Sequence, residues 1–381
     1  MIYADNAATT RLSEAAFEKM LPFLREQYGN ASSRYTFGVK AKRVIEEARR
    51  QVAVAIGAEP SEIAFTSGGS EGNSWVIQGI ARLFNGENIH VVASSIEHHS
   101  VLNACRKIET CGVSVTYVPV DSVGRISVRD VASSIRPNTK LVSVMFANNE
   151  IGTIQPIAEI GKYLREKDVL FHTDAVQAVG HIPVNVKDLQ LDFLTASAHK
   201  FNGAKGTGFL YKRSGIDLPQ LIFGGEQEHG QRAGTENVAG ITAMGYALEE
   251  SVADMSLISE KLTALAETSI NGLKAEIPEI RINGQGAERL PGIVNITFPY
   301  ASGEAVMRLL DLKEVCVSTS SACNSGKDEA SHVLLALGLS EKQAKSSIRI
   351  SYGRYNAMEE AERIVSTVSD VYAKIIANHN Y

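Results

Sequence analysis

Along the first two thirds of the chain, stretches with apolar residues at helical spacing alternate with short continuous apolar runs. Residues 13–27 carry apolar side chains at helical spacing behind Ser13, whose hydroxyl can cap a helix N-terminus, and a second helix is expected at about residues 39–56. Short apolar runs typical of buried strands follow, and helical stretches separate most of them. These runs are residues 63–65, 89–93, 113–118, 141–145, 169–171, 193–196 and 208–211. The alternation predicts an α/β fold with a mostly parallel sheet covered by helices.

The hydrophobic pattern changes in the last third of the chain. One long helix, with apolar residues on one face and charges on the other, is expected from about residue 237 to 275. Residues 294–298 and 348–352 then alternate between apolar and polar side chains, as half-exposed strands do. A final helix is expected over residues 357–377. This change of pattern predicts a second, smaller domain of the α+β class.

Length and composition are compatible with two domains and exclude some partners. A chain of 381 residues with 44% hydrophobic residues can bury two cores, which we assign to residues 15–260 and to residues 1–14 with 261–381. The net charge is −5 and no basic run is longer than residues 40–43, so neither nucleic acid nor an anionic membrane surface is indicated. The N-terminus does not resemble a signal peptide, and no apolar run reaches the ~20 residues of a membrane span. We therefore expect a cytoplasmic protein.

The four cysteines form no Cys-x-x-Cys pair and have no histidine partner at zinc-finger spacing. We therefore expect no metal site and, in a reducing compartment, no disulfide. Cys105, Cys111 and Cys316 are interpreted as packing residues. Cys323 lies in the small, polar stretch 318–327, where an exposed thiol could act as a nucleophile or be a plain loop cysteine.

One lysine and one aspartate suggest cofactor chemistry. Lys200 lies among small residues and glycines directly after an apolar run, and Asp174 ends another apolar run 26 positions upstream. Pyridoxal phosphate needs an amine for a Schiff base and a carboxylate at its protonated ring nitrogen. Lys200 alone would be interpreted as a surface lysine. Its pairing with a strand-end aspartate is what points to a pyridoxal-phosphate site.

Polar groups also follow the other apolar runs. The serine and glycine turn at residues 66–72 precedes a helical stretch and could present backbone N–H groups to a phosphate. His98 could stack on a pyridine ring, although a packing histidine is the simpler interpretation of that residue alone. An amide at residues 148–149 and the amide of Gln177 could bond the phenolic oxygen of the cofactor. Because parallel strands end at one edge of a sheet, these groups are expected to form one site.

A series of ordered motifs then resembles the cysteine desulfurases of the NifS and IscS type, pyridoxal-phosphate enzymes of fold type I in the class V aminotransferase group. The likeness runs nearly end to end. The motifs are residues 3–10, 28–33, 97–99, 148–152, 174–177, 198–200, 232–237 and 321–323. The resemblance implies a large domain with a mostly parallel sheet, a smaller domain that carries the cysteine loop, and pyridoxal 5'-phosphate as cofactor.

The same resemblance implies a role for each matching residue. Lys200 would form the Schiff base, Asp174 would pair with the pyridinium nitrogen, and His98 would stack on the ring. Further contacts to the cofactor would come from Asn149 and Gln177 at the phenolic oxygen and from Gly69, Ser70, Ser197 and His199 at the phosphate, joined by Thr235 of the neighbouring subunit in a homodimer. Arg349 and Asn149 would bind the substrate, Arg349 holding its carboxylate through the planar fork of the guanidinium.

The implied reaction converts L-cysteine to L-alanine. Lys200 would take the α-proton, and Cys323 would attack the substrate sulfur and keep it as a persulfide. His98 could supply a proton. The persulfide would pass to a sulfur-acceptor protein for iron-sulfur cluster assembly or tRNA thiolation, as in the long-loop branch whose spacing after Cys323 this chain shares. The chain departs from the family pattern at Ser70, Gly72 and Ala330, where threonine, a bulkier residue and proline are common.

Two other functions stay open at this point. The first is another enzyme of the same group, a selenocysteine lyase or an aminotransferase, and Cys323 argues against the aminotransferase. The second is a catalytically silent sulfur-relay or scaffold protein, against which the presence of Lys200, Asp174, His98 and Cys323 argues.

Overall fold

The computed structural model describes residues 1–84, 88–319 and 329–379, and Cys323 lies outside the described residues. Its larger sheet has seven strands in the order β2-β8-β7-β6-β5-β3-β4. The strands are β2 (Ile63–Thr66), β3 (His90–Ser94), β4 (Ser114–Val118), β5 (Thr139–Ser143), β6 (Leu170–Asp174), β7 (Phe193–Ser197) and β8 (Gly208–Lys212). Only β8 runs antiparallel to its neighbours, so the predicted mostly parallel sheet is confirmed.

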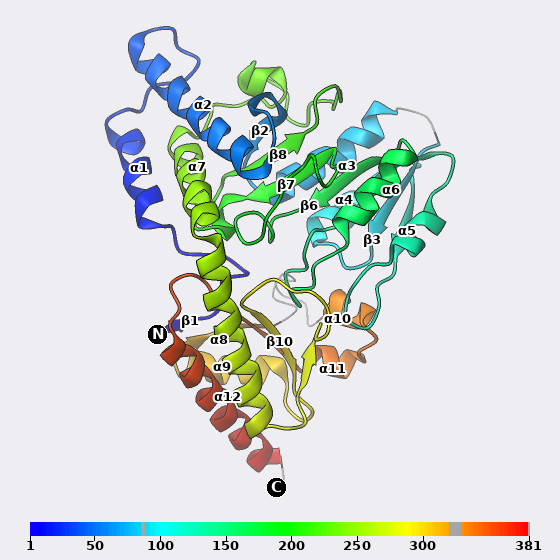
Figure 1. Cartoon of the computed structure of the whole chain (residues 1–381), viewed down its shortest axis with the longest axis vertical. Coiled ribbons are helices and arrows are strands. Elements are labelled where there is room, and N and C mark those ends of the chain that lie inside the picture. Colours follow the sequence, from blue (N-terminus) through cyan, green and yellow to red (C-terminus); the bar gives the residue numbers. More distant parts are fainter. Residues whose placement is uncertain (85–87, 320–328, 380–381) are drawn as a thin grey trace.

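Helices cover both faces of this sheet (Figure 1). Along β3, Val91 and Ala93 join a core with Trp75, whereas Val92 joins the opposite core with Ile45. This period of two is that of a strand buried on both sides. One face carries α3 (Gly69–Leu83) and α4 (His99–Glu109), and the other carries α1 (Glu14–Arg25), α2 (Thr36–Ile56), α5 (Val128–Ser134), α6 (Ile157–Glu166) and α7 (Val238–Ala253).

The long helix expected after residue 237 is in fact two helices. Helix α7 ends at Asp254, which has φ −92° and ψ 0°, and α8 (Met255–Glu276) begins directly after it. Arg354 forms ion pairs with Asp254 and, at 3.2 Å, with Glu250, so a distant part of the chain is fixed to the break. Helix α8 then leads away from the large sheet into the smaller part of the molecule (Figure 1).

The smaller part contains a four-stranded antiparallel sheet in the order β12-β13-β10-β9. Its strands are β9 (Arg281–Asn283), β10 (Ile293–Thr297), β12 (Ser318–Thr319) and β13 (Ser347–Ser351). Helices α8, α9 (Gly303–Asp311) and α12 (Met358–His379) pack on its apolar face. Near the N-terminus, β1 (Ile2–Tyr3) pairs with β11 (Val315–Cys316) in parallel. The domain boundaries assigned from the sequence stay a prediction.

The strands β10 and β13 are buried along their whole length, so the prediction that they are half-exposed is wrong. Their polar side chains bond within the molecule instead of facing solvent. Asn295 donates to the carbonyl of Glu150 at 3.1 Å, and Thr297 bonds Ser347 at 2.7 Å. Because Glu150 follows β5 of the large sheet, the polar face of the small sheet lies against the large one.

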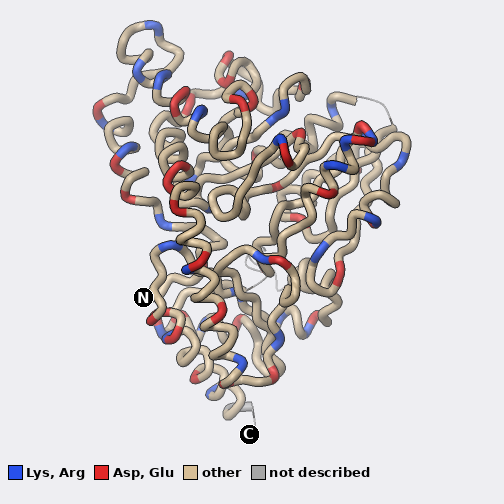
Figure 2. Tube along the Cα trace, viewed as in Figure 1, with Lys and Arg blue, Asp and Glu red and all other residues tan. Residues whose placement is uncertain are grey.

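The three described cysteines lie in different environments. Cys105 is fully buried in α4 and confirms the packing interpretation, and Cys316 in β11 is half-buried. Cys111 is exposed in the turn after α4, so the packing interpretation is wrong for it. Charges of both signs are scattered over the chain trace (Figure 2). Within the described ranges, no helix has the length and apolar character needed to cross a membrane.

Candidate active site

The carboxyl edge of the large sheet brings the predicted site residues together. Strand β6 ends at Asp174 and β7 ends at Ser197, from which a short 3-10 turn, Ala198–Lys200, leads to the lysine. His98 caps the N-terminus of α4, just beyond β3. These segments lie at one edge because their strands run in the same direction.

The amine of Lys200 is held by the N-terminal segment. Its Nζ donates to the carbonyls of Ala7 at 2.5 Å and Ala8 at 2.8 Å. Gln177 Nε2 donates to the same Ala7 carbonyl at 2.9 Å, so the lysine and this amide meet at one atom. The backbone of Lys200 is fixed as well, because His181 Nε2 bonds its carbonyl at 3.0 Å.

Asp174 is a buried carboxylate that accepts hydrogen bonds from one side chain and one backbone N–H. Asn73 Nδ2 lies 2.6 Å from its Oδ2, and the Val176 N–H donates to its Oδ1 at 3.0 Å. Burial lowers the pKa of His98, the Asp174 carboxylate acts to raise it, and the charge of Lys200 lowers it again. The three predicted residues therefore lie within electrostatic reach of one another.

A cavity of about 350 Å³ opens at the N-terminus of α3 and could hold a phosphate. It is lined by Gly69, Ser70, Ser197, His199 and Lys205, together with Thr9, residues 67, 68 and 71 and Gly206. The first N–H groups of a helix have no partner within it and attract anions. His199 bonds Thr9 Oγ1 at 3.1 Å, and burial lowers the pKa of its imidazole to about 4, so this ring is a neutral group at the cavity wall.

Glycines allow the close packing at the start of α3, beside this cavity. Gly68 has φ +145°, which side chains rarely adopt, and a Cβ on Gly69 would lie 2.6 Å from Val176 Cγ2. A Cβ on Gly72 would lie 2.7 Å from Thr195 Cγ2. Thr195 thus fills the space that a bulkier residue at position 72 would need.

Arg349 lies on β13, on the polar face of the small sheet, with only 6% of its side chain exposed. It donates from Nη1 to the carbonyl of Asn149 at 2.9 Å and from Nη2 to Asp5 Oδ1 at 2.6 Å. Its Nε is buried and has no hydrogen-bond partner among the described residues. Since an unpaired buried donor is costly, this guanidinium is suited to receive an anionic ligand.

Thr235 lies apart from the other predicted residues. It is exposed and lines a separate cavity of about 160 Å³, which shares Ser67 and Gly206 with the phosphate-sized cavity. Its segment is fixed by Arg232, which bonds both carboxylate oxygens of Glu71 at 2.8 and 3.0 Å. Within one chain, Thr235 therefore does not join the group around Lys200.

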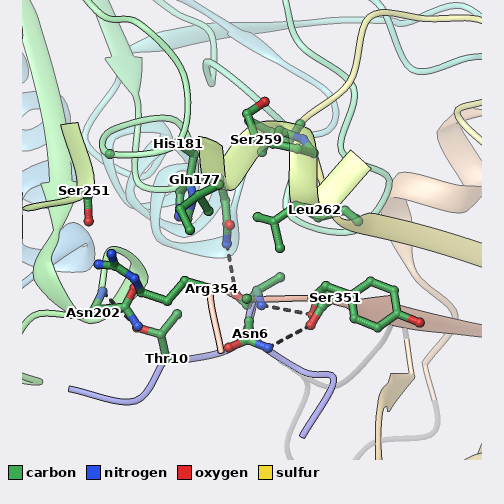
Figure 3. A pocket seen from close by; sticks show the side chains of 18 of the residues that line it. Asn6, Thr10, Gln177, His181, Asn202, Ser251, Ser259, Leu262, Ser351 and Arg354 are labelled. Carbon is green, nitrogen blue, oxygen red and sulfur yellow. Dashed lines mark hydrogen bonds between the residues drawn. The ribbon is translucent and has the colours of Figure 1, made fainter. Parts of the chain in front are cut away.

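A third, smaller cavity lies next to Gln177 (Figure 3). It has a volume of about 40 Å³ and is lined by Asn6, Thr10, His181 and Arg354, among others. The Gln177 amide reaches the backbone of the N-terminal segment from this side, and Asn6 Nδ2 donates to the carbonyl of Ser351 at 3.0 Å. This volume suits a few water molecules and is too small for an amino acid.

The buried Glu150 makes folding stability depend on pH. Burial raises the pKa of its carboxyl to about 7, against the lowering effects of Ser331, which donates at 2.5 Å, and of Arg349. The folded protein therefore binds a proton that the unfolded chain has lost above its ordinary pKa of 4.5, so this contribution to stability falls as pH rises from about 5 to 7. We predict that Glu150→Gln becomes more stable relative to the unsubstituted protein by on the order of 2 kcal/mol between about pH 5 and pH 8, measured by urea unfolding. A difference independent of pH would contradict this.

The sequence reasoning missed several groups at this site. Asn73 directly follows the serine and glycine turn at residues 66–72, and its position four residues after Gly69, on the same helix face, is the signal that could have indicated it. Asp5 and the carbonyls of Ala7 and Ala8 have no local sequence signal that would have indicated contact with Arg349 or Lys200.

Comparison with known proteins identifies the family. The class-V aminotransferase model matches residues 2–364. The cysteine desulfurase IscS of Methanosarcina thermophila is 46% identical over 374 residues, which cover 98% of this chain and 92% of that protein. The cysteine desulfurase IscS of Dictyoglomus turgidum is also 46% identical, over 98% of this chain and 95% of that protein.

Solved structures agree with this assignment. A NifS-like protein superposes with a TM-score of 0.92 at 36% identity, covering 98% of this chain and 99% of that one. A structure of SspA in complex with cysteine gives a TM-score of 0.84 at 37% identity, covering 94% and 100%. The chain belongs to the class-V aminotransferase family, among its cysteine desulfurases.

Proposed function

We propose that this protein is a pyridoxal-phosphate-dependent cysteine desulfurase, which converts L-cysteine to L-alanine and holds the sulfur as a persulfide on Cys323. The observation that carries the proposal is the convergence of two cations on residues 5–8. Lys200 reaches this segment through the carbonyls of Ala7 and Ala8, and Arg349 reaches it through Asp5. In this arrangement the amine can act at the α-carbon of an amino-acid substrate while the guanidinium binds its carboxylate.

The residues present fit pyridoxal 5'-phosphate. The cavity at the N-terminus of α3 has room for a phosphate, and Asp174 offers a carboxylate to the ring nitrogen. When bound, the cofactor would supply an aldehyde that reacts with amines and a ring that accepts an electron pair. Lys200 would hold its aldehyde carbon, His98 would lie against the ring, and Asn149 and Gln177 would bond its phenolic oxygen.

The chain's own residues then divide the remaining work. Arg349 would bind the substrate carboxylate through its unpaired Nε, and the Lys200 amine would take the α-proton. The thiolate of Cys323 would attack the substrate sulfur, so that an S–S bond forms as the substrate's C–S bond breaks and the carbon skeleton leaves as alanine. Cys323 lies outside the described residues, and its role comes from the sequence motif.

The finer parts of the proposal concern assembly and partners. Thr235 is exposed and lies apart from Lys200 in its own chain, which supports a homodimer in which it reaches the phosphate of the neighbouring subunit. We place the protein in the cytoplasm. The sulfur acceptor would be a protein of iron-sulfur cluster assembly or a tRNA thiolase, as the names of the relatives suggest for the first.

The assay of products tests this function. Purified protein given L-cysteine and a reductant should release alanine and sulfide in equal amounts. An aminotransferase would instead need a 2-oxo acid and release no sulfide, and a silent scaffold protein would yield neither product. Either of those results would refute the desulfurase assignment.

Replacing Arg349 should weaken substrate binding. In Arg349→Gln the substrate carboxylate loses a charged partner, and we expect the KM for cysteine to rise by roughly a hundredfold with a smaller change in kcat. Arg354→Gln is the matched control, because Arg354 is also an ion-paired, partly buried arginine of the C-terminal part. A KM that is unchanged in Arg349→Gln, or raised equally in both variants, would contradict this assignment.

A further inference from the structure

We infer that a hydrogen-bond chain from Asp174 through Asn73 and Ser100 holds His98 in the tautomer that carries its proton on Nε2, with Asn73 and Ser100 as positioning residues. The four side chains come from three segments: Asp174 from β6, Asn73 from α3, and His98 and Ser100 from the start of α4. The consequence for catalysis rests on the proposed function, but the tautomer itself does not.

Asn73 fixes which groups donate and which accept along this hydrogen-bond chain. This side chain is fully buried, and its Nδ2 lies 2.6 Å from Asp174 Oδ2 and 2.8 Å from Ser100 Oγ. A carboxylate can only accept hydrogen bonds, so the amide must present its nitrogen to Asp174. Both hydrogens of Nδ2 are then used, one for each neighbour. Asn73 Oδ1, on the other side of the amide, has no hydrogen-bond partner within the described segments.

Ser100 accepts a hydrogen bond from Asn73 and can therefore donate one to the imidazole of His98. Its Oγ accepts from Asn73, so its own hydroxyl hydrogen is available to His98 Nδ1, 2.8 Å away. The backbone N–H of Ser100 also donates to Nδ1, at 3.1 Å, which makes His98 the N-cap of α4. An N–H group cannot accept a hydrogen bond, so Nδ1 must carry a lone pair. In the neutral ring the proton therefore resides on Nε2.

This arrangement limits what His98 can do. Protonation at Nδ1 would break both bonds from Ser100, and Nε2, already protonated, has no lone pair with which to accept a proton. Burial, followed by the charges of Lys200 and His99, also lowers the pKa of this ring against the effect of Asp174. His98 thus contributes a neutral Nε2–H donor, which could give up its proton only by becoming an imidazolate, so we expect Lys200 and not His98 to carry the proton transfer.

Nitrogen NMR of the ¹⁵N-histidine-labelled holoenzyme tests the tautomer directly. His98 is assigned by the signals lost in His98→Asn. We expect its Nδ1 at the position of an unprotonated ring nitrogen and its Nε2 at that of a protonated one. Signals showing the proton on Nδ1, or on both nitrogens at neutral pH, would overturn the inference. The unsubstituted protein suffices for this measurement, so it does not depend on whether a variant folds.

Substitutions test the hydrogen-bond chain from Asp174 to His98. Ser100→Ala removes the hydroxyl link but keeps the backbone N–H on Nδ1, so the proton should stay on Nε2 while the Nδ1 signal moves further toward that of an unprotonated nitrogen without a hydroxyl donor. Ser95→Ala is the control, because Ser95 Oγ is buried nearby with no hydrogen-bond partner in the described part of the chain, and its spectrum should match the unsubstituted protein. A Ser100→Ala spectrum identical to that of the unsubstituted protein would refute the positioning role. Because these spectra need no turnover, a protein with the expected tautomer and no sulfide release would refute the proposed function alone.

Discussion

Replacing Lys200 with alanine should reduce alanine formation from cysteine by at least about a thousandfold. The amine has two proposed tasks, attachment of the cofactor and transfer of the α-proton, and no other described side chain donates to both the Ala7 and Ala8 carbonyls. Borohydride reduction followed by peptide mass spectrometry should find the cofactor on the peptide containing Lys200 in the unsubstituted protein and on no peptide in the variant.

Lys187→Ala is the control for this experiment. Lys187 is an exposed lysine of the same sheet-bearing part, paired with Glu59 at 2.9 Å, and its replacement should leave both readouts unchanged. Trapped cofactor on another lysine, or substantial alanine formation by Lys200→Ala, would remove Lys200 from the mechanism.

Replacing Cys323 with alanine should abolish sulfide release while cofactor binding remains. Sulfur transfer needs a thiolate that accepts the substrate sulfur, and alanine offers none, so we expect a loss of at least about a thousandfold. The absorbance of the bound cofactor should still change when cysteine is added, because Lys200, Asp174 and Arg349 are intact.

Cys111→Ala serves as the control for Cys323→Ala, since Cys111 is an exposed cysteine that has no proposed role. It should release sulfide at the rate of the unsubstituted protein. Equal loss in the two variants would indicate a general effect of removing a thiol, and full activity in Cys323→Ala would exclude the persulfide on this residue.

The parallel sheet and the edge that carries the site could be predicted because both follow from local patterns. Each buried strand appears as an apolar run, and polar residues at its end, such as His98, Asp174 and Lys200, must meet where parallel strands end. The contacts between these residues were beyond such reasoning. Asn73 reaches Asp174 across 101 positions and Asp5 reaches Arg349 across 344, and only the folded chain defines such pairs.

Two errors in the predicted elements have the same physical origin. The residues around Asp254 contain neither glycine nor proline, so the sequence pattern predicts an uninterrupted helix there. In the folded chain the helix breaks at this point, where Arg354 forms ion pairs with Asp254 and Glu250. Strands β10 and β13 alternate like half-exposed strands, but their polar side chains contact the segment after β5 and the N-terminal segment. Alternation of apolar and polar residues indicates that the two faces of a strand differ, but it does not indicate whether solvent or another part of the protein covers the polar face.

A single-turnover experiment without reductant tests the central claim most directly. The purified protein is mixed with L-cysteine, alanine is quantified, and the peptides are analysed by mass spectrometry. The account predicts about one alanine per subunit and one additional sulfur atom on the peptide containing Cys323, which a reductant removes as sulfide. Alanine without added sulfur on that peptide, or added sulfur on Cys105, Cys111 or Cys316 instead, would contradict it.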